Sequence, residues 1–343
     1  MTIDHASTST NPMTGFKPAW WLRNRHLQTI WPVLLRRRAP ITLTEERLEL
    51  PDGDFIDLAW GPCPSTPGPT ALLLHGLEGS IDSHYIGGML AALSGAGWRS
   101  VLMHFRGCSG EPNRLARRYH SGETSDLAYV AATLRARHPD SPLCAVGFSL
   151  GGNVLLKWLG ETGAANPLTA AVAVSVPFEL DRSVKMLEQG FARVYERYLL
   201  RRLLRSTRRK FASRDTAGID PAALAKVRTL WNFDDAVTAP LHGFRDARDY
   251  YRQSSSRPFL ASIAVPTLVV HALDDPFLPR DSVPRAVDVS DSVTLELSEH
   301  GGHVGFIGGA SPWRPYYYLE QRIPQYLSAH CAEQPIPTNS SRS

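Results

Sequence analysis

The sequence alternates short, continuously apolar runs with longer segments of helical periodicity, and this alternation restricts the fold more than any other feature. The apolar runs are residues 70–75, 99–104, 143–148, 168–176, 267–271 and 293–297. Strands that are apolar on both faces are typical of a parallel sheet covered by helices. Two earlier runs, 43–50 and 55–60, flank the turn Pro51-Asp52-Gly53 and predict an antiparallel pair. The sequence therefore predicts an α/β fold with a mostly parallel sheet flanked by helices.

One long segment interrupts this alternation. Residues 178–265 contain no convincing strand, are rich in Arg, Leu and Tyr, and are mostly helical in their periodicity. Because a structureless loop of that length is rare inside a domain, we expect a helical cap insertion there. It would divide the core into a first part, 16–177, and a second part, 266–330. Residues 1–15 and 331–343 have the polar composition of chain tails.

A serine stands at the junction of a predicted strand and a predicted helix. Gly147-Phe148-Ser149-Leu150-Gly151 matches the pattern G-x-S-x-G, with the run 143–148 before it and a helical pattern over 150–161 after it. The sharp turn of this pattern lifts the serine hydroxyl above the sheet, and glycine lets strand and helix approach. A glycine-rich turn with a helix-capping serine is the alternative. The flanking strand and helix favour Ser149 as a nucleophile.

Two backbone amides are expected beside this serine. His75-Gly76-Leu77 follows the run 70–75 directly, and Leu150 follows Ser149. In serine hydrolases built on such a sheet, an amide after an early strand and the amide after the nucleophile together bind the oxyanion. We therefore expect the N–H groups of Leu77 and Leu150 to stabilise the tetrahedral intermediate, and the His75 side chain to be structural.

The acid and the base are expected on loops that follow two later strands. Serine is a weak nucleophile at neutral pH, so it needs an adjacent imidazole, which in turn needs an orienting carboxylate. The run 267–271 leads to Asp274-Asp275-Pro276, and the run 293–297 leads to His300-Gly301-Gly302-His303. Both loops lie at carboxyl ends of strands, where an open α/β sheet places its ligands.

Each loop offers two choices. We favour Asp275 over Asp274 because the acid in such loops usually stands directly before the proline. We favour His303 over His300 because Gly301-Gly302 lets the chain fold back to present the later histidine. Asp234-Asp235 lies in the expected insertion and is interpreted as a capping or ion-pairing pair.

The overall composition argues against several classes of function. A formal net charge of +4 on 343 residues gives no support for nucleic-acid binding. The four cysteines, Cys63, Cys108, Cys144 and Cys331, form no C-x-x-C pair, and we find no phosphate loop, dinucleotide fingerprint or metal-ligand cluster. We therefore expect no metal, no cofactor and no disulfide framework. Without a secretory signal or a run of about 20 apolar residues, we expect a cytoplasmic protein, and contact with a membrane surface is left open.

Seven segments carry further motifs in a recognisable order: 24–32, 75–80, 105–110, 119–122, 147–153, 274–277 and 300–306. In this order the chain resembles the YheT-like branch of the α/β-hydrolase family, which includes abhydrolase-domain esterases and phospholipases. The resemblance covers about residues 16–327. It implies the α/β-hydrolase fold and a carboxylic-ester hydrolase acting on acylglycerols, phospholipids or medium-chain esters. It also places the catalytic triad on Ser149, Asp275 and His303.

The leading functional hypothesis is ester hydrolysis through an acyl-enzyme on Ser149, with His303 as general base and Asp275 as the orienting acid. The first alternative is an acyltransferase that uses the same triad. The second is a non-catalytic ligand-binding protein on the same fold, which the intact triad disfavours.

Basic and aromatic segments allow two interpretations. Residues 195–210 place four leucines on one helical face and arginines on the other, and we favour a packed helix over one that lies on a lipid surface. Trp20, Trp21 and Trp31, near Arg36-Arg37-Arg38, either face a membrane or pack against the insertion.

Arg106 follows the run 99–104 and also has two interpretations. It either binds an anionic headgroup or, as we favour, pairs with a carboxylate such as Glu111 or Glu123.

Overall fold

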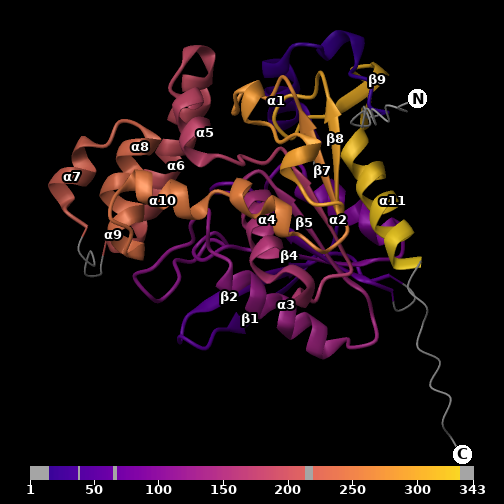
Figure 1. The fold of residues 1–343 in the computed structure, drawn as a ribbon, viewed down its shortest axis with the longest axis horizontal. Coiled ribbons are helices and arrows are strands. Elements are labelled where there is room, and N and C mark those ends of the chain that lie inside the picture. The colour runs from indigo at the N-terminus through magenta and orange to yellow at the C-terminus, as the bar shows by residue number, and fades with distance from the viewer. Residues whose placement is uncertain (1–14, 38, 65–67, 213–218, 333–343) are drawn as a thin grey trace, which may run out of the picture.

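A computed structural model describes residues 15–37, 39–64, 68–212 and 219–332 (Figure 1). The strands are β1 (Thr44–Glu49), β2 (Phe55–Trp60), β3 (Thr70–Leu74), β4 (Arg99–Met103), β5 (Leu143–Phe148), β6 (Ala170–Val174), β7 (Thr267–Ala272), β8 (Val293–Ser298), β9 (Ile307–Ser311) and β10 (Arg314–Tyr317). The helices are α1 (Arg25–Leu35), α2 (Ile86–Gly95), α3 (Ser125–Arg137), α4 (Leu150–Thr162), α5 (Leu180–Leu187), α6 (Arg193–Phe211), α7 (Pro221–Lys226), α8 (Leu230–Phe233), α9 (Ala239–His242), α10 (Ala247–Ser254) and α11 (Tyr318–Ala332). Most of the two expected tails lies outside the described residues, but Cys331 and Ala332 continue α11.

The larger sheet has eight strands in the order β1-β2-β4-β3-β5-β6-β7-β8 among the described residues. β2 pairs antiparallel with β1 and with β4, while every pairing from β4 to β8 is parallel. The carboxyl ends of the parallel strands therefore lie at one edge of the sheet. The mostly parallel sheet between helices confirms the fold class expected from the apolar runs.

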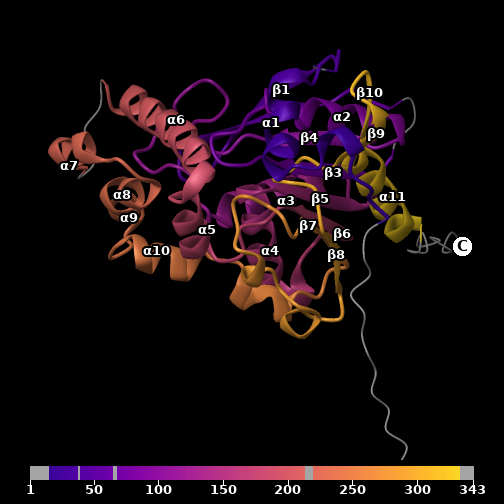
Figure 2. The same ribbon diagram turned by 90° about the horizontal axis from the view of Figure 1, so that it is seen from above.

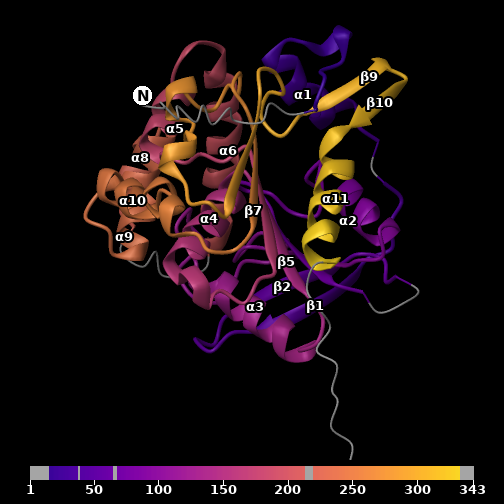
Figure 3. The ribbon, with the colours of Figure 1, turned by 45° about the vertical axis from the view of Figure 1, so that its right-hand side comes forward.

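Helices cover both faces of this sheet. In β3, Leu72 and Leu74 belong to the apolar cluster under α3 and α4, while Ala71 and Leu73 belong to the cluster under α2 and α11. Successive side chains of a strand point to opposite faces, so a strand buried on both sides must be apolar throughout. Figure 3 shows α2 and α11 side by side on their face of the sheet.

The described residues between β6 and β7 form helices α5 to α10 and no strand. These helices gather at the end of the molecule opposite α11 (Figure 2) and surround an apolar cluster of their own. In α6, Leu200 and Leu203 are buried in that cluster, and Leu199 and Leu204 pack against it. The leucine face of α6 therefore packs inward, which agrees with the packed-helix interpretation.

Three elements were not expected from the sequence: α1, α2 and the hairpin of β9 and β10. α2 is apolar and glycine-containing around its whole circumference, so it shows no amphipathic pattern. α1 begins at a clear cap, because the Asn24 side chain accepts hydrogen bonds from the amides of His26 and Leu27. The hairpin has very short strands, and β9 contains Gly308 and Gly309.

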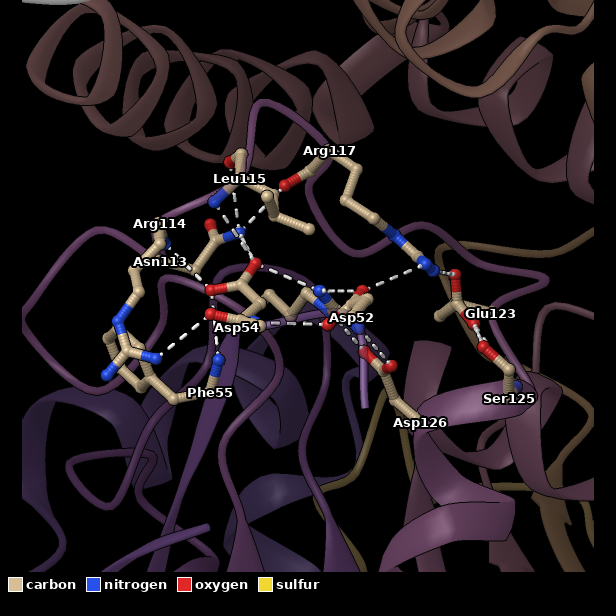
Figure 4. Close-up of polar contacts among 12 residues, drawn as sticks. Asp52, Asp54, Phe55, Asn113, Arg114, Leu115, Arg117, Glu123, Ser125 and Asp126 are labelled. Carbon is tan, nitrogen blue, oxygen red and sulfur yellow. Dashed lines mark hydrogen bonds and ion pairs between the residues drawn. The ribbon is translucent and has the colours of Figure 1, made fainter. Parts of the chain in front are cut away.

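Arg106 joins the turn between β1 and β2 to the start of α3. Its Nη1 atom lies 2.8 Å from Asp52 Oδ2 and 2.9 Å from Asp54 Oδ2, and its Nη2 atom lies 2.6 Å from Asp126 Oδ1. Figure 4 shows Asp52, Asp54 and Asp126 turned toward one another. Because Arg106 is buried among three carboxylates, its guanidinium is not available to a headgroup.

The favoured interpretation, that Arg106 pairs with carboxylates, is therefore confirmed, but the two partners named for it are wrong. Glu111 lies 2.8 Å from Arg47 instead, and Glu123 pairs with Arg117. The carboxylates that do bind Arg106 come from a hairpin turn and from a distant helix, so spacing along the chain does not indicate them.

Candidate active site

Ser149 occupies a strained turn between β5 and α4. Its φ and ψ are 52° and −119°, a conformation that costs free energy for any residue with a side chain. A Cβ atom at Gly147 would lie 2.5 Å from the carbonyl oxygen of Gly151, and one at Gly151 would lie 2.6 Å from that of His75. Only glycine fits at both positions, and this close approach holds the serine at the edge of the sheet.

The structure brings the three sequence-predicted side chains together. His303 Nε2 lies 2.9 Å from Ser149 Oγ, and His303 Nδ1 lies 2.8 Å from Asp275 Oδ2. Asp275 is 1% exposed and His303 is 8% exposed, so water hardly competes for these contacts. An imidazole held between a carboxylate and a hydroxyl can accept the hydroxyl proton.

Phe277 contacts both Asp275 and His303. Its amide donates to Asp275 Oδ1 over 2.8 Å, so the second carboxylate oxygen is also held. Its ring lies parallel to the His303 ring, with 3.9 Å between centroids and 1° between planes. The imidazole therefore cannot turn without losing this stacking contact.

Asp274 and His300 form a separate pair on the outer side of the same loops. His300 Nδ1 lies 3.2 Å from Asp274 Oδ2, and the Gly302 amide donates to Asp274 Oδ1 over 3.0 Å. Burial raises the pKa of Asp274 above its ordinary value. The pair supports the backbone that presents His303, and neither side chain contacts Ser149.

Helix α1 supports the His303 loop from behind, a role that the sequence reasoning missed. The His303 amide donates to Thr29 Oγ1 over 3.0 Å. Gln28 is fully buried; its Nε2 donates to the Leu22 and Ile307 carbonyls, and its Oε1 accepts from the Ile307 amide. Polar residues inside an apolar helix were the available signal, since both lie in the motif at residues 24–32.

Leu77 and Leu150 line one cavity together with Ser149 and His303. Leu150 is the first residue of α4, so its amide has no partner within the helix. The Leu77 amide finds no acceptor among the residues that the structure describes, whereas the amide of Gly76 beside it donates to Tyr85 over 2.9 Å. Both residues that carry the expected oxyanion donors thus line the cavity that contains Ser149.

Glu78 holds the loop that contains Leu77. Its φ is 52°, another strained value. Its amide donates to the Tyr119 hydroxyl over 2.7 Å, and that hydroxyl donates back to Glu78 Oε1 over 3.0 Å. Arg118 donates both to Glu78 Oε1, over 3.1 Å, and to Ser206 in α6, over 2.7 Å. This network ties the loop after β3 to the helical segment, and local sequence patterns did not reveal it.

Two further histidines, His75 and His271, are fully buried near the site. His75 Nε2 accepts from the Phe105 amide over 3.2 Å, which links the ends of β3 and β4, and burial lowers its pKa to about 3. Burial lowers the pKa of His271, in β7, to about 4. Both rings are therefore neutral at physiological pH.

Two cavities meet at Ser149 and His303, and Leu77, Leu199 and Phe277 line both of them. The inner cavity has a volume of about 100 Å³ and extends among the helices between β6 and β7. Its lining is mostly apolar: Val184, Leu187, Leu230, Phe233 and Val237. The outer cavity, of about 470 Å³, lies between α1 and α6.

Polar groups also reach the inner cavity. Asp234 accepts from Thr238 and from Tyr251, both over 2.6 Å, and burial raises its pKa to about 6. Asp235 accepts from the Ala247 amide at the start of α10 over 3.0 Å. This pair is thus held by neutral donors, and neither carboxylate forms an ion pair with a described residue.

The described residues contain no group of three or more His, Cys, Asp or Glu side chains that could hold a metal ion. In the same part of the chain, no helix combines the length and the apolar character that crossing a membrane requires.

Comparisons with known proteins assign the chain to a family. Residues 69–310 match the family described as alpha/beta hydrolase fold. The Escherichia coli (strain K12) protein YheT, whose name describes it as a candidate esterase, is 48% identical over 322 residues, or 93% of each chain. The chain belongs to the α/β-hydrolase family. Within the family it falls in the YheT-like branch that its motifs indicated.

More distant relatives of this hydrolase extend the comparison. Phospholipase ABHD3 of Mus musculus is 30% identical over 334 residues, covering 95% of this hydrolase and 80% of the relative. A solved structure of a Pyrococcus furiosus esterase superposes with a TM-score of 0.52 at 15% identity, covering 92% of this hydrolase and 99% of that chain. That likeness supports the fold.

Proposed function

We propose that this hydrolase cleaves carboxylic esters through an acyl-enzyme on Ser149, with His303 as general base and Asp275 as the orienting acid. The observation that carries the proposal is the continuous chain from Asp275 through His303 to Ser149, with contacts of 2.8 and 2.9 Å at a strained turn. Similarity to relatives that are named for esterase and phospholipase activity supports it.

In the first half of the reaction, Ser149 Oγ attacks the ester carbonyl carbon while His303 Nε2 takes its proton. Negative charge moves to the carbonyl oxygen, where the Leu77 and Leu150 amides would stabilise it; such donors typically contribute a few kcal/mol. Asp275 stabilises the imidazolium and keeps Nδ1 protonated. The tetrahedral intermediate then collapses, and His303 gives its proton to the departing alcohol, leaving an acyl ester on Ser149.

In the second half, water replaces the alcohol. His303 Nε2 takes a proton from the water molecule, whose oxygen attacks the acyl carbon. Collapse of the second intermediate returns the proton to Ser149 Oγ and releases the carboxylic acid. An acyltransferase would use another alcohol or thiol in place of water at this step.

We also propose a division of the chain by role. Residues 16–177 and 266–330 form the core that holds the catalytic loops, and 178–265 form a cap over the substrate. The apolar inner cavity suits an acyl chain, and the outer cavity suits the alcohol portion. Acylglycerols, phospholipids and medium-chain esters all fit this description.

The test is turnover of soluble p-nitrophenyl esters by the wild type, by Ser149→Ala and by the control Ser109→Ala, whose hydroxyl contacts Asp57 away from the site. We expect the wild type and the control to release free acid, and Ser149→Ala to lose activity by about 10⁶-fold in kcat. Wild-type inactivity would favour a binding protein. Predominant transfer of the acyl group to added glycerol would favour an acyltransferase.

A further inference from the structure

Exposed apolar side chains concentrate on two short segments. Twelve large hydrophobic side chains are exposed among the described residues, and eight of them lie between residues 20 and 35 or between 191 and 198. Those of α1 are Leu27, Val33, Leu34 and Leu35, of which Leu34 is 72% exposed. Those at the start of α6 are Phe191, Val194 and Tyr198, each at least half exposed. Such clustering differs from the scattered exposed residues of an ordinary surface.

The two segments are in contact and border the mouth of the active site. His26 Nδ1, in α1, lies 3.0 Å from the Tyr195 hydroxyl in α6, and the His26 and Phe191 rings lie 4.5 Å apart. The outer cavity, which reaches Ser149 and His303, is lined by Val33 and Leu34 on one side and by Val194 and Tyr198 on the other. The exposed apolar side chains therefore surround an opening that leads to the nucleophile.

The longer segments that contain these two, residues 15–37 and 190–212, are strongly cationic, although Arg36 pairs with Glu320 and Lys210 donates to Asn113. Residues 15–37 and 190–212 contain thirteen Lys or Arg and one acidic residue, Glu196, although the whole chain carries a formal net charge of only +4. Glu196 is buried and accepts from the Leu230 amide. Arg197, Arg201 and Arg205 are exposed, share a helical face with Val194 and Tyr198, and form no ion pair with a described residue.

We propose that α1 and α6 form a docking face that rests on an anionic lipid bilayer, with the outer cavity opening toward the lipid. The docking face comprises the exposed apolar side chains of residues 27–35 and 191–198 and the arginines at 197, 201 and 205. The apolar side chains enter the headgroup region while the arginines contact anionic lipid, as in interfacial helices. Only the fate of the captured lipid rests on the proposed ester hydrolysis; the docking itself does not need catalysis.

The charge of the docking face favours an anionic bilayer over a second copy of the chain or a nucleic acid. A second copy of the chain on the same face would oppose two strongly cationic surfaces across an interface, which is unfavourable. A nucleic acid would match the charge but would leave the apolar side chains around the cavity in water. An anionic bilayer satisfies both features and also presents ester groups to the cavity.

The test is co-sedimentation of the Ser149→Ala protein, which cannot consume lipid, with vesicles of phosphatidylcholine alone or mixed with phosphatidylglycerol. We expect binding to the mixed vesicles, little binding to phosphatidylcholine, and weaker binding at high salt. Arg197→Gln with Arg201→Gln should weaken binding about 30-fold, and Leu35→Asp about 10-fold. The matched controls Arg248→Gln, on α10, and Val287→Asp, a residue 81% exposed elsewhere, should bind like the parent.

None of the residues replaced in these four variants lines either cavity. When the same substitutions are made in the protein that keeps Ser149, turnover of a soluble ester should therefore not change. Equal vesicle binding by the docking-face and control variants would overturn the docking proposal while leaving ester hydrolysis intact. The docking proposal would also be overturned if the parent protein bound no vesicles but self-associated, and if Leu35→Asp abolished that self-association. Vesicle binding by a protein that turns over no ester would instead remove the proposed activity and keep the docking face.

Discussion

The loops at the carboxyl edge of the sheet and the helices between β6 and β7 are built on different principles. In the loops, polar side chains have several partners: both oxygens of Asp275 are engaged, and His303 is held by a carboxylate, a ring and a backbone contact. The helices contribute a mostly apolar lining to the inner cavity. The difference suggests that the loops fix the chemistry and the helices select the substrate. Changes in the two regions should therefore alter different kinetic constants.

The largest difference in kcat is expected between substitutions of two neighbouring aspartates. Asp275→Asn should lower kcat about 10⁴-fold, because an amide cannot hold His303 in the productive tautomer. Asp274→Asn removes a contact that supports only the backbone of the loop, so it should cost about tenfold or less. Steady-state kinetics on a soluble ester measures both. The reverse order of effects would transfer the role of orienting acid to Asp274.

Glu78 connects the two regions, so its replacement tests whether the helices also influence the chemistry. Glu78→Gln weakens the contacts with Arg118 and Tyr119 and loosens the loop that carries Leu77. We expect kcat to fall about 30-fold with little change in KM, which is less than the loss of a whole oxyanion donor. Glu111→Gln, which lies near Arg47 at the surface, is the control. A change confined to KM would show that Glu78 does not position the loop.

The helices should control acyl-chain length. Val184, in α5, lines the inner cavity only, whereas Val194, in α6, lines the outer cavity only. Val184→Phe should lower kcat/KM about tenfold for long acyl chains and leave the shortest chains unaffected, because it shortens the apolar space. Val194→Phe should leave the chain-length profile unchanged. A profile altered by Val194→Phe alone would place the acyl chain in the outer cavity.

The smallest effect concerns stability rather than turnover. His120 and His242 line the inner cavity with ring centroids 4.5 Å apart, and burial lowers their pKa from 6.5 to about 4 and about 3. Below pH 6.5 the unfolded chain therefore binds protons that the folded chain does not. Their contribution to stability is complete above pH 6.5 and is lost as the pH falls toward 4. The free energy of unfolding, measured in urea at several pH values, should fall between pH 6.5 and 4 in the wild type and should fall less steeply in His242→Gln. His330→Gln, on α11, is the control. If its free energy of unfolding depended on pH as weakly as that of His242→Gln, the assignment to the buried histidine pair would be contradicted.

Local patterns in the sequence predicted much of the core. Buried parallel strands are apolar on both faces, so their positions along the chain could be read directly, and the G-x-S-x-G turn marked Ser149. The sequence also indicated which loops would bring Asp275 and His303 near that serine. The family and the fold class are confirmed, whereas the catalytic roles and the domain division stay predictions.

Contacts between distant segments were harder to foresee. Arg106 binds carboxylates from a hairpin turn and from α3, and spacing alone suggested the wrong partners. Gln28 and Thr29 reach the loops after β8 from the other end of the chain. The tryptophans near α1 suggested a membrane-facing surface as one interpretation, but the exposed side chains of α1 could not be assigned to one face, because the helix itself was not expected. Each of these features depends on three-dimensional proximity that no local periodicity encodes.

Covalent labelling distinguishes an activated Ser149 from an ordinary serine. The wild type is treated with a fluorophosphonate, which reacts with activated serines, and the modified peptide is identified by mass spectrometry. We expect a single adduct on Ser149, which is absent in Ser149→Ala and retained in Asp274→Asn. An unlabelled wild type, or an adduct on a different serine, would contradict the assignment of Ser149 as the nucleophile.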